Sequence, residues 1–370
     1  MKTRAAVLWE LGRDWEVVEL DLDEPRDHEV LIRFEAAGLC HSDEHLRHGD
    51  IVPRFPIVGG HEGAGVIEKV GPGVTRVAEG DHVVCSFIPS CGYCRWCGTG
   101  HQNLCDWGAL ILEGSMPDQT FRFHSDGEDV GGMCMLGTFA QWAVISEHSC
   151  VKVDDDLPLD VAVLVGCGVP TGWGSSVYAA DVEPGETVVI YGIGGIGANA
   201  VQGAAMAGAA NVVAVDPLAN KREAADDLGA THSVGSAEEA YELTQELTRG
   251  VGADKAIITV DVVNEDVVAA AVEAIRKGGT TVITGLADPH KLTVQLSGAD
   301  LTLYEKTVKG TLFGSANPMH DIPKLLGLYR AGKLKLDELI TRRYTLDEVN
   351  QGYRDLLDGK NIRGVLIHEH

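Results

Sequence analysis

The feature that most constrains the fold of this chain is a glycine-rich turn between a strand-like run and an alanine-rich segment. The apolar run TVVIY at 187–191 leads into the turn, and a helix is predicted over 195–209. The turn has the spacing G-x-G-x-x-G, with glycines at Gly192, Gly194, Gly195 and Gly197. Such glycines permit a tight turn and let backbone N–H groups approach a pyrophosphate at the helix N-terminus. In this strand–turn–helix context, the spacing predicts a dinucleotide site.

Strands and helices continue to alternate after this turn. A strand is predicted over 211–216, a helix over 221–230, and further strands over 255–260 and 280–285, with a helix over 266–279 before the last strand. This alternation is typical of an α/β domain built on a parallel, doubly wound sheet.

Asp216 ends the second of these strands, 19 residues after Gly197. A carboxylate at this place can accept hydrogen bonds from both ribose hydroxyls and would repel a 2′-phosphate, which favours NAD over NADP. Lys221 and Arg222 lie close by and weaken that preference. The alternative is a glycine-rich turn with an incidental acid, but the order of strand, turn, helix, strand and acid argues against it.

The first 150 residues have a different pattern, in which short β-like runs are separated by glycine. The runs are AAVLW, EVLIRFEAAG, GAGVIEKVG and DHVVCSFIPS, and they predict a mostly-β domain. Near the C-terminus we expect a helix over 323–331 and a final strand in GVLIHEH. The pattern alone leaves open whether this end belongs to the α/β domain or to the first one.

Four cysteines lie within fifteen residues with the spacing C-x2-C-x2-C-x7-C, at Cys91, Cys94, Cys97 and Cys105. Four thiolates on one short loop can close a tetrahedron around Zn²⁺ and leave no open position for chemistry. Disulfides or an Fe–S cluster are alternatives, but the cysteine total of nine is odd and the proline of ferredoxin motifs is missing. The spacing therefore predicts a structural zinc lobe over about residues 91–105.

Three further segments each carry one candidate ligand for a second zinc. They contain Cys40, His61 and Cys167, and a Cys2His set leaves a fourth position for water or substrate. Each residue taken singly has a simpler interpretation as a buried thiol or a structural histidine. Spacing does not join the three, because the segments lie far apart in the chain.

Composition excludes several classes of protein. The net charge of −25 is spread along the chain and would repel phosphate backbones, so we expect no nucleic-acid partner. The apolar stretches are too short to span a bilayer, and the N-terminus lacks a secretory cleavage pattern. We therefore expect a cytoplasmic protein with no membrane association.

The whole chain resembles the zinc-containing medium-chain alcohol dehydrogenases. The resemblance rests on GLCHSDEH, GGHEGAG, the four-cysteine lobe, CGVPTGWG, GIGGIG with Asp216, and NIRGVL, in the family's order. It implies a discontinuous GroES-like catalytic domain over 1–168 and 312–370, and a Rossmann coenzyme domain over 169–311. It also implies two zinc ions per subunit, NAD(H), an alcohol or aldehyde substrate, and a homo-oligomer that is a dimer or a tetramer.

The resemblance assigns roles to residues near the metal. Cys40, His61 and Cys167 match the catalytic zinc ligands, and Glu62 matches a carboxylate that can act as an alternate ligand. Asp43 matches the acid that orients the zinc-binding histidine. Ser42 matches the hydroxyl bonded to the alcohol, and His45 matches the outer base of a proton relay that runs through the ribose hydroxyls. In that scheme, zinc acts as a Lewis acid on the alcohol and hydride passes to the nicotinamide.

The resemblance also suggests how this chain differs within the family. Thr171, Lys221 and Arg363 match residues that line the cofactor site, whereas His41 stands where many relatives carry an arginine that binds the pyrophosphate. Apolar side chains are expected to form a substrate pocket for medium-sized or aromatic alcohols, namely Ile51, Phe87, Leu104 and Leu110. The stretch from Arg95 to Phe139 resembles bacterial alcohol dehydrogenases assayed with nitrosodimethylaniline, some of whose relatives are nicotinoproteins that keep NAD(H) bound.

Other functions remain as alternatives. A glutathione- or thiol-dependent formaldehyde dehydrogenase belongs to the same family, but its charged positions correspond here to Ile51 and Ala109. A zinc-free quinone or enoyl reductase would lack the candidate zinc ligands, and a non-enzymatic zinc module would lack the dinucleotide site. Cys85, Cys134 and Cys150 have no role that the sequence assigns.

Overall fold

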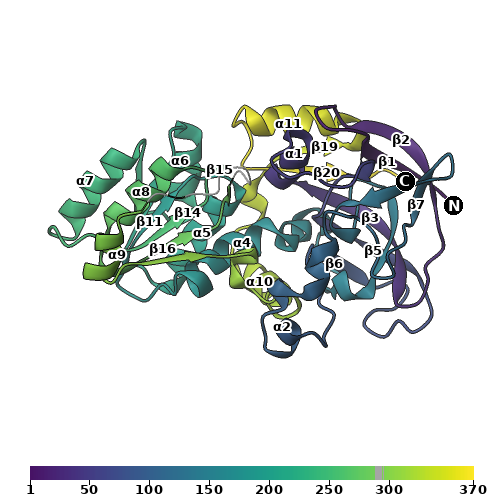
Figure 1. Cartoon of the computed structure of the whole chain (residues 1–370), viewed down its shortest axis with the longest axis horizontal. Coiled ribbons are helices and arrows are strands. Elements are labelled where there is room, and N and C mark those ends of the chain that lie inside the picture. Colours follow the sequence, from purple (N-terminus) through teal and green to yellow (C-terminus); the bar gives the residue numbers. More distant parts are fainter. Residues whose placement is uncertain (288–293, 295) are drawn as a thin grey trace. The chain divides into compact units, whose positions relative to one another are not determined.

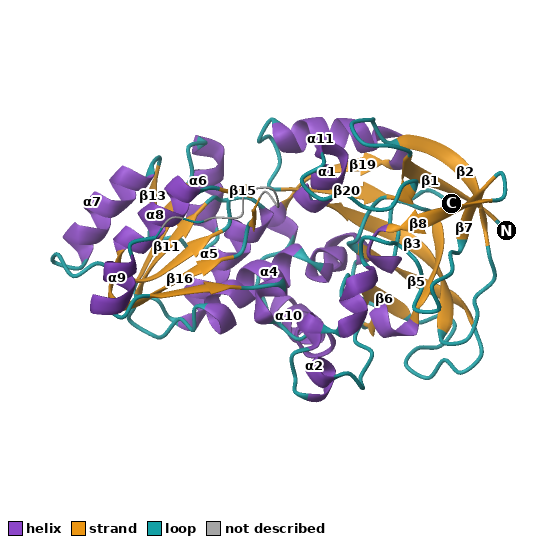
Figure 2. Cartoon of the chain, viewed as in Figure 1, coloured by secondary structure: helices purple, strands orange, loops and turns teal. Residues whose placement is uncertain are grey.

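A computed structural model describes residues 1–287, 294 and 296–370 of the chain (Figures 1 and 2). The chain forms two compact units, one made of residues 1–167 and 317–370 and the other of residues 168–316. The boundaries predicted from the sequence differ from these by one to five residues. None of the described helices is long and apolar enough to cross a bilayer.

The first unit is mostly β. Its strands are β1 (Lys2–Leu8), β2 (Glu16–Leu22), β3 (Glu29–Leu39), β4 (Ile57–Val58), β5 (Gly63–Val70), β6 (His82–Cys85), β7 (Phe123–Ser125), β8 (Glu128–Gly132), β9 (Trp142–Ser146), β10 (Cys150–Lys152), β19 (Ile340–Thr345) and β20 (Arg363–Ile367). Its helices are α1 (His41–His48), α2 (Arg95–Gly98), α3 (Leu159–Ala162), α10 (Pro318–Arg330) and α11 (Val349–Leu357).

Two sheets organise these strands. Strands β1, β2, β7, β8 and β4 close into a barrel, and a second sheet has the order β10-β6-β5-β3-β20-β19, with β9 also paired to β3. Strand β3 pairs with β5, β9 and β20, and almost all of its residues are buried. The C-terminal strand β20 lies in this sheet next to β3, which places the C-terminal end of the chain with the first domain.

The second unit is an α/β layer structure. Its strands are β11 (Thr187–Tyr191), β12 (Asn211–Val215), β13 (His232–Val234), β14 (Ala253–Ile258), β15 (Val262–Val263), β16 (Ile275–Ile283), β17 (Leu286–Ala287) and β18 (Thr307–Gly310). Its helices are α4 (Gly168–Gly174), α5 (Gly195–Ala207), α6 (Ala219–Asp227), α7 (Ala237–Leu247), α8 (Glu265–Ala274) and α9 (Gly298–Leu303).

The main sheet of this unit is parallel and has the order β13-β12-β11-β14-β16-β18. Val189 and Tyr191 of β11 belong to one core cluster with Ala240 of α7 and Val268 of α8. Because side chains alternate along a strand, Val188 and Ile190 face the opposite layer, and α5 contacts β11 and β12. This arrangement confirms the doubly wound sheet that the sequence predicted.

Two predicted helix boundaries were wrong by five residues. The helix predicted over 266–279 ends at Ala274, and Ile275 already begins β16, whose pairing with β14 takes over the segment. The last residues of the predicted helix include Gly278, whose φ of 69° lies outside the range of a right-handed helix. The helix predicted from Pro323 starts at Pro318 instead, where a proline in the first turn loses no helical hydrogen bond.

Candidate active site and metal centres

Cys40 and His61 meet because they flank two neighbouring strands. Cys40 follows β3 and precedes α1, whereas His61 lies just before β5. The strands pair antiparallel with Ala37 opposite Gly63, so that the end of β3 lies beside the start of β5. The backbone N–H of Gly38 donates to the carbonyl oxygen of Glu62 at 3.1 Å, which extends the pairing to the residues next to both ligands.

Cys167 arrives from a segment more than a hundred residues later in the chain. It follows a short 3-10 turn, Val163–Gly166, and a Cβ atom at Gly166 would lie 2.8 Å from the carbonyl oxygen of Cys85. Glycine therefore permits the close approach of this segment to β6, which pairs with β5. The potential ligand atoms of Cys40, His61, Glu62 and Cys167 all lie within 4.8 Å of one another, and all four residues are buried.

The ring of His61 is oriented by Asp43. Its Nδ1 lies 3.3 and 3.4 Å from the two carboxylate oxygens of Asp43, which is fully buried and also accepts a hydrogen bond from the N–H of Gly60 at 2.9 Å. Because a carboxylate only accepts, Nδ1 carries the proton in the neutral ring and Nε2 carries the lone pair. That Nε2 is buried and has no hydrogen-bond partner among the described residues, which fits a metal ligand.

The electrostatics of the cluster favour one thiolate. A hydrogen bond from Cys167 and the positive charge of His61 hold the pKa of Cys40 well below its usual range, against the effect of burial. The same hydrogen bond, together with burial, raises the pKa of Cys167. Burial opposes protonation of His61, but the carboxylate of Asp43 and the sulfur of Cys40 outweigh it and raise the pKa of the imidazole.

Arg363 lies against Glu62. Strand β20 pairs with β3, with Gly364 opposite Leu39, and this places the buried guanidinium of Arg363 in a salt bridge with Oε2 of Glu62. Burial raises the pKa of Glu62 to about 7, although Arg363 opposes the shift. The structure thus brings Arg363 to the metal cluster, and its expected contact with the cofactor stays a prediction.

Helix α1 carries the two residues of the expected proton relay. The hydroxyl oxygen of Ser42 lies 3.6 Å from Sγ of Cys40, so that Ser42 borders the cluster. His45 is one turn further along α1, and its Nδ1 lies 2.8 Å from Oδ2 of Asp50. The sequence did not identify Asp50, because residue spacing does not show where the loop after α1 places its side chains.

Of the residues expected to form the substrate pocket, Phe87 contacts a residue of the cluster. The ring of Phe87 packs edge-on against the ring of His61, with centroids 5.8 Å apart. Ile51 follows α1 and donates its N–H to the carbonyl of His45 at 3.2 Å. Leu104 lies on the short turn just before Cys105 and Leu110 on the turn just after it, and Leu104 is 41% exposed. The roles of all four in a pocket stay predictions.

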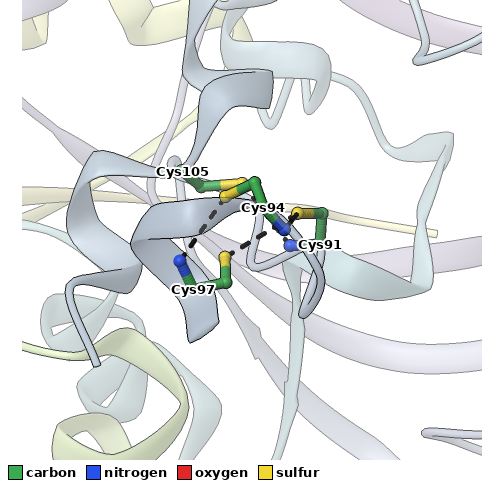
Figure 3. Close-up of side chains that lie close together, drawn as sticks. All are labelled: Cys91, Cys94, Cys97 and Cys105. Carbon is green, nitrogen blue, oxygen red and sulfur yellow. Dashed lines mark hydrogen bonds between the residues drawn. The ribbon is translucent and has the colours of Figure 1, made fainter. Parts of the chain in front are cut away.

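The four cysteines of the lobe converge around α2 (Figure 3). Sγ of Cys91 lies 3.8 Å from Sγ of Cys97, which is close to the edge of a tetrahedron with Zn–S bonds of about 2.3 Å and far from a disulfide bond. Backbone N–H groups point at the sulfurs, as from Cys97 to Cys94 at 3.4 Å. Burial raises the pKa of Cys94, but N–H groups of Cys97 and Asp106 outweigh it and lower the pKa to about 6. The donor set fits zinc.

The glycine-rich turn has the geometry that its motif requires. Gly192 has a φ of 89°, and a Cβ atom at Gly197 would lie 1.9 Å from the carbonyl oxygen of Gly192. Gly195 begins α5, and a Cβ atom at Gly194 would meet no atom of the described residues within 4 Å. The turn is therefore packed on its inner side and open at Gly194, beside the helix N-terminus, which fits a bound pyrophosphate.

Asp216 lies at the end of β12, next to this turn. Its carboxylate accepts hydrogen bonds from the N–H groups of Ile193 at 2.8 Å and of Leu218 at 2.9 Å. Lys221 is buried on α6, and burial lowers the pKa of its ammonium although Asp216 opposes the shift. Thr171 is buried on α4 of the same unit, and His41 is the first residue of α1 in the other unit. Their contacts with a cofactor stay predictions.

The remaining cysteines are free thiols in buried positions. Cys85 and Cys150 face each other across β6 and β10. Cys134 lies near the catalytic cluster, and burial raises the pKa of its thiol to about 12, with the charges of Asp43 and Cys40 adding to the shift. The phenol of Tyr353 also lies near Asp43. Burial raises the pKa of this phenol, and the negative charge of Asp43 adds to the shift.

Known families match both units of the chain. Residues 26–155 match the alcohol dehydrogenase GroES-like domain, and residues 195–330 match the zinc-binding dehydrogenase family. The chain is 68% identical over 368 residues to an NDMA-dependent alcohol dehydrogenase of Amycolatopsis methanolica, with 100% of this chain and 99% of the relative covered. The chain belongs to the zinc-type alcohol dehydrogenases. The enzyme is therefore an oxidoreductase, and its family implies zinc and a nicotinamide dinucleotide.

More distant comparisons agree with this family. The dehydrogenase is 49% identical over 368 residues to alcohol dehydrogenase B of Mycobacterium tuberculosis, and the alignment covers 99% of this chain and 98% of the relative. Benzyl alcohol dehydrogenase from Acinetobacter calcoaceticus superposes with a TM-score of 0.93 at 31% identity, covering 100% of both chains. These likenesses confirm the predicted fold class, a GroES-like domain together with a Rossmann domain.

Proposed function

We propose that the protein oxidises a primary alcohol to an aldehyde, and catalyses the reverse reaction, by hydride transfer to and from NAD. The observation that carries this proposal is the buried set of Cys40, His61 and Cys167, in which Nε2 of His61 has no other partner among the described residues. These three residues would hold a catalytic zinc, and the four-cysteine lobe would hold a structural zinc, which makes two per subunit.

When bound, zinc supplies Lewis-acid polarisation of an alcohol oxygen, which makes its proton easier to remove. The chain contributes orientation: Asp43 fixes the ring of His61, and Arg363 holds one oxygen of Glu62. This salt bridge favours Cys40, His61 and Cys167 as the resident ligands and Glu62 as an exchangeable one. Ser42, beside Cys40, would accept the alcohol proton and pass it towards His45.

The second unit would bind NAD. Its turn presents backbone N–H groups and open space at Gly194, and the acid at Asp216 favours NAD over NADP. Thr171, Lys221, His41 and Arg363 are proposed to contact the cofactor. Because a relative with 68% identity is named for its dependence on NDMA, we infer that NAD(H) stays bound and that electrons leave to a second acceptor.

The substrate is proposed to be a medium-sized or aromatic alcohol. Phe87 gives the cluster an apolar border, and a neighbour of the same fold is named benzyl alcohol dehydrogenase. A thiol-dependent formaldehyde dehydrogenase is the second candidate, but Ile51 and Ala109 offer no charge for a glutathione adduct. A zinc-free quinone or enoyl reductase would leave the buried Cys2His set without a role.

The proposal includes the organisation of the protein. The unit with residues 1–167 and 317–370 would be the catalytic domain, and the unit with residues 168–316 the coenzyme domain. A homo-oligomer, a dimer or a tetramer, in the cytoplasm is the expected state.

The metal requirement is tested with Cys40→Ser and, as a matched control, Cys150→Ser, which changes a buried thiol that is not a proposed ligand. Zinc is counted by elemental analysis, and turnover is measured with benzyl alcohol and either NAD or nitrosodimethylaniline. We expect Cys40→Ser to lose about one zinc per subunit and its turnover while it keeps the nucleotide. Full turnover in Cys40→Ser would overturn the zinc mechanism.

The state of the cofactor is tested by dialysing the protein exhaustively, denaturing it and analysing the released nucleotides by chromatography. About one NAD(H) per subunit is expected if the cofactor stays bound. Its absence would make NAD a dissociable cosubstrate, and the enzyme an ordinary dehydrogenase.

A further inference from the structure

The turn after α1 brings a carboxylate onto the ring of His45. Gly49 has a φ of 90°, in the left-handed region, and its N–H donates to the carbonyl of His45 at 3.0 Å. The N–H of Ile51 donates to the same carbonyl at 3.2 Å. Two bonds to one acceptor fold the loop back over the end of the helix, and Asp50 between them places Oδ2 2.8 Å from Nδ1 of His45.

This contact differs from an ordinary surface ion pair in its burial. The side chain of His45 is 6% exposed, whereas that of Asp50 is 37% exposed. The imidazole is therefore held in a fixed, mostly dry position, whereas the carboxylate keeps contact with water. A short bond between an ionised and a neutral group in such a place is stronger than a bond between two neutral groups.

The chemistry of the pair fixes the tautomer of the ring. A carboxylate only accepts hydrogen bonds, so Nδ1 of the neutral imidazole must carry its proton. The lone pair then lies on Nε2, the atom on the far side of the ring from Asp50. If the ring takes a second proton at Nε2, the carboxylate stabilises the resulting positive charge.

We propose that Asp50 is a positioning residue that holds His45 in the tautomer with its lone pair on Nε2 and strengthens Nε2 as a proton acceptor. This inference rests on the proposed role of His45 in moving the alcohol proton. Asp50 contacts neither metal ligand nor substrate in this scheme and acts through the imidazole alone.

Other charges surround this end of α1 and must be separated from the effect of Asp50. Glu44 is paired with Arg47 and His48, and Asp14, from the loop before β2, is also paired with Arg47. Among the described residues, the titratable and charged groups on α1 and on the loops paired with it are Asp50, His41, Asp43, Glu44, Arg47, His48 and Asp14.

The test compares Asp50→Asn with Asp50→Glu and with Asp14→Asn, which removes the same charge from the same helix environment but does not touch the imidazole. The full-length, zinc-loaded protein is labelled with ¹³C and ¹⁵N at histidine, and the ring signals of His45 are identified by their loss in His45→Gln. NMR then gives the tautomer and the pH midpoint of the ring, and steady-state kinetics gives the pH profile of alcohol oxidation.

We expect Asp50→Asn to move the midpoint to lower pH by about one unit, with the Nδ1–H tautomer no longer fixed, and to move the rising limb of the rate profile the same way. Asp50→Glu should recover part of both shifts, and Asp14→Asn should leave both close to those of the wild type. An unchanged midpoint and tautomer in Asp50→Asn would overturn the inference. A shifted NMR midpoint with an unchanged rate profile would support the pair and would contradict the relay through His45, so the two failures are distinct.

Discussion

The glycine-rich turn allows stability and cofactor binding to be separated by two substitutions of the same size. Gly197 and Gly194 lie three residues apart, and each would gain one methyl group as alanine. At Gly197 the new Cβ would lie 1.9 Å from the carbonyl oxygen of Gly192 and 2.8 Å from Oγ1 of Thr259. At Gly194, where φ is −86°, it would meet no atom within 4 Å in the part of the chain that the structure describes.

The magnitudes follow from these contacts. Relief of the overlap at Gly197 requires the turn to move by about 1 Å, because a Cβ atom is not found within about 3 Å of a backbone oxygen. Such overpacking costs about 1–3 kcal/mol. In a unit of roughly 150 residues, this lowers the midpoint of thermal unfolding by about 2–12 °C.

Gly194→Ala should leave the midpoint unchanged, but its methyl group would occupy the space proposed for the pyrophosphate. The loss of one hydrogen bond to a charged group, about 1.5–3 kcal/mol, would weaken NAD binding by about 10- to 150-fold.

The assay follows unfolding by calorimetry, so that the transitions of the two units are seen separately, and NAD affinity by isothermal titration after the bound nucleotide has been removed. The expected pattern is a loss of stability in Gly197→Ala and a loss of affinity without loss of stability in Gly194→Ala. If Gly194→Ala bound NAD as tightly as the wild type, the pyrophosphate could not lie against this turn. If Gly197→Ala kept its full stability, the packing described for the turn would be wrong.

Three further predictions concern the first unit. Asp43→Asn should weaken binding of the catalytic zinc by about 10- to 100-fold in a chelator competition, because the Asp43 carboxylate orients His61. The zinc of the cysteine lobe should stay bound, and an equal affinity for the catalytic zinc in the variant and the wild type would refute this role. Arg122→Ala should destabilise this unit by about 3–5 kcal/mol in denaturant unfolding, because it strands the buried carboxylate of Glu29, which Arg122 contacts at 2.7 Å. His368 has its pKa lowered to about 4 by burial, so the unfolded chain binds more protons between about pH 4 and 6.5 and stability falls as the pH drops through that window. As the pH is lowered through this range, the thermal midpoint should fall less in His368→Gln than in the wild type. An equal fall in both proteins would count against the lowered pKa of His368.

The sites that the sequence could place are those built from one short segment. The glycines of the dinucleotide turn lie within six residues, and their packing depends on the turn itself and on Thr259, which directly follows the neighbouring strand β14. The cysteine lobe is equally local, since backbone N–H groups within the loop already point at its sulfurs. In such segments the spacing of residue types along the chain determines almost all of the geometry of the site.

The catalytic cluster could not be assembled in that way. Cys40 and His61 meet through the pairing of β3 with β5, and Cys167 joins them only because Gly166 lets its segment approach β6. Residue spacing does not contain these pairings, so the set was predicted by resemblance to a family. The salt bridge between Arg363 and Glu62 escaped prediction for the same reason, because it depends on β20 lying beside β3. Tertiary pairing likewise ended α8 at Ala274, although the local pattern favoured a longer helix.

The glycines around both sites have a common physical role, which is to set how closely two backbones approach. Gly197 and Gly166 both face a backbone carbonyl, at 1.9 and 2.8 Å from the position of a Cβ atom, and a carbonyl cannot rotate away as a side chain can. Gly38 differs, because its Cβ would lie 2.2 Å from Oε2 of Glu62, which is the end of a side chain. That oxygen is nevertheless held by Arg363, so an alanine at Gly38 could be accommodated only if the salt bridge moved. The tolerance of the metal cluster to a substitution in β3 therefore depends on a contact with β20, at the other end of the chain.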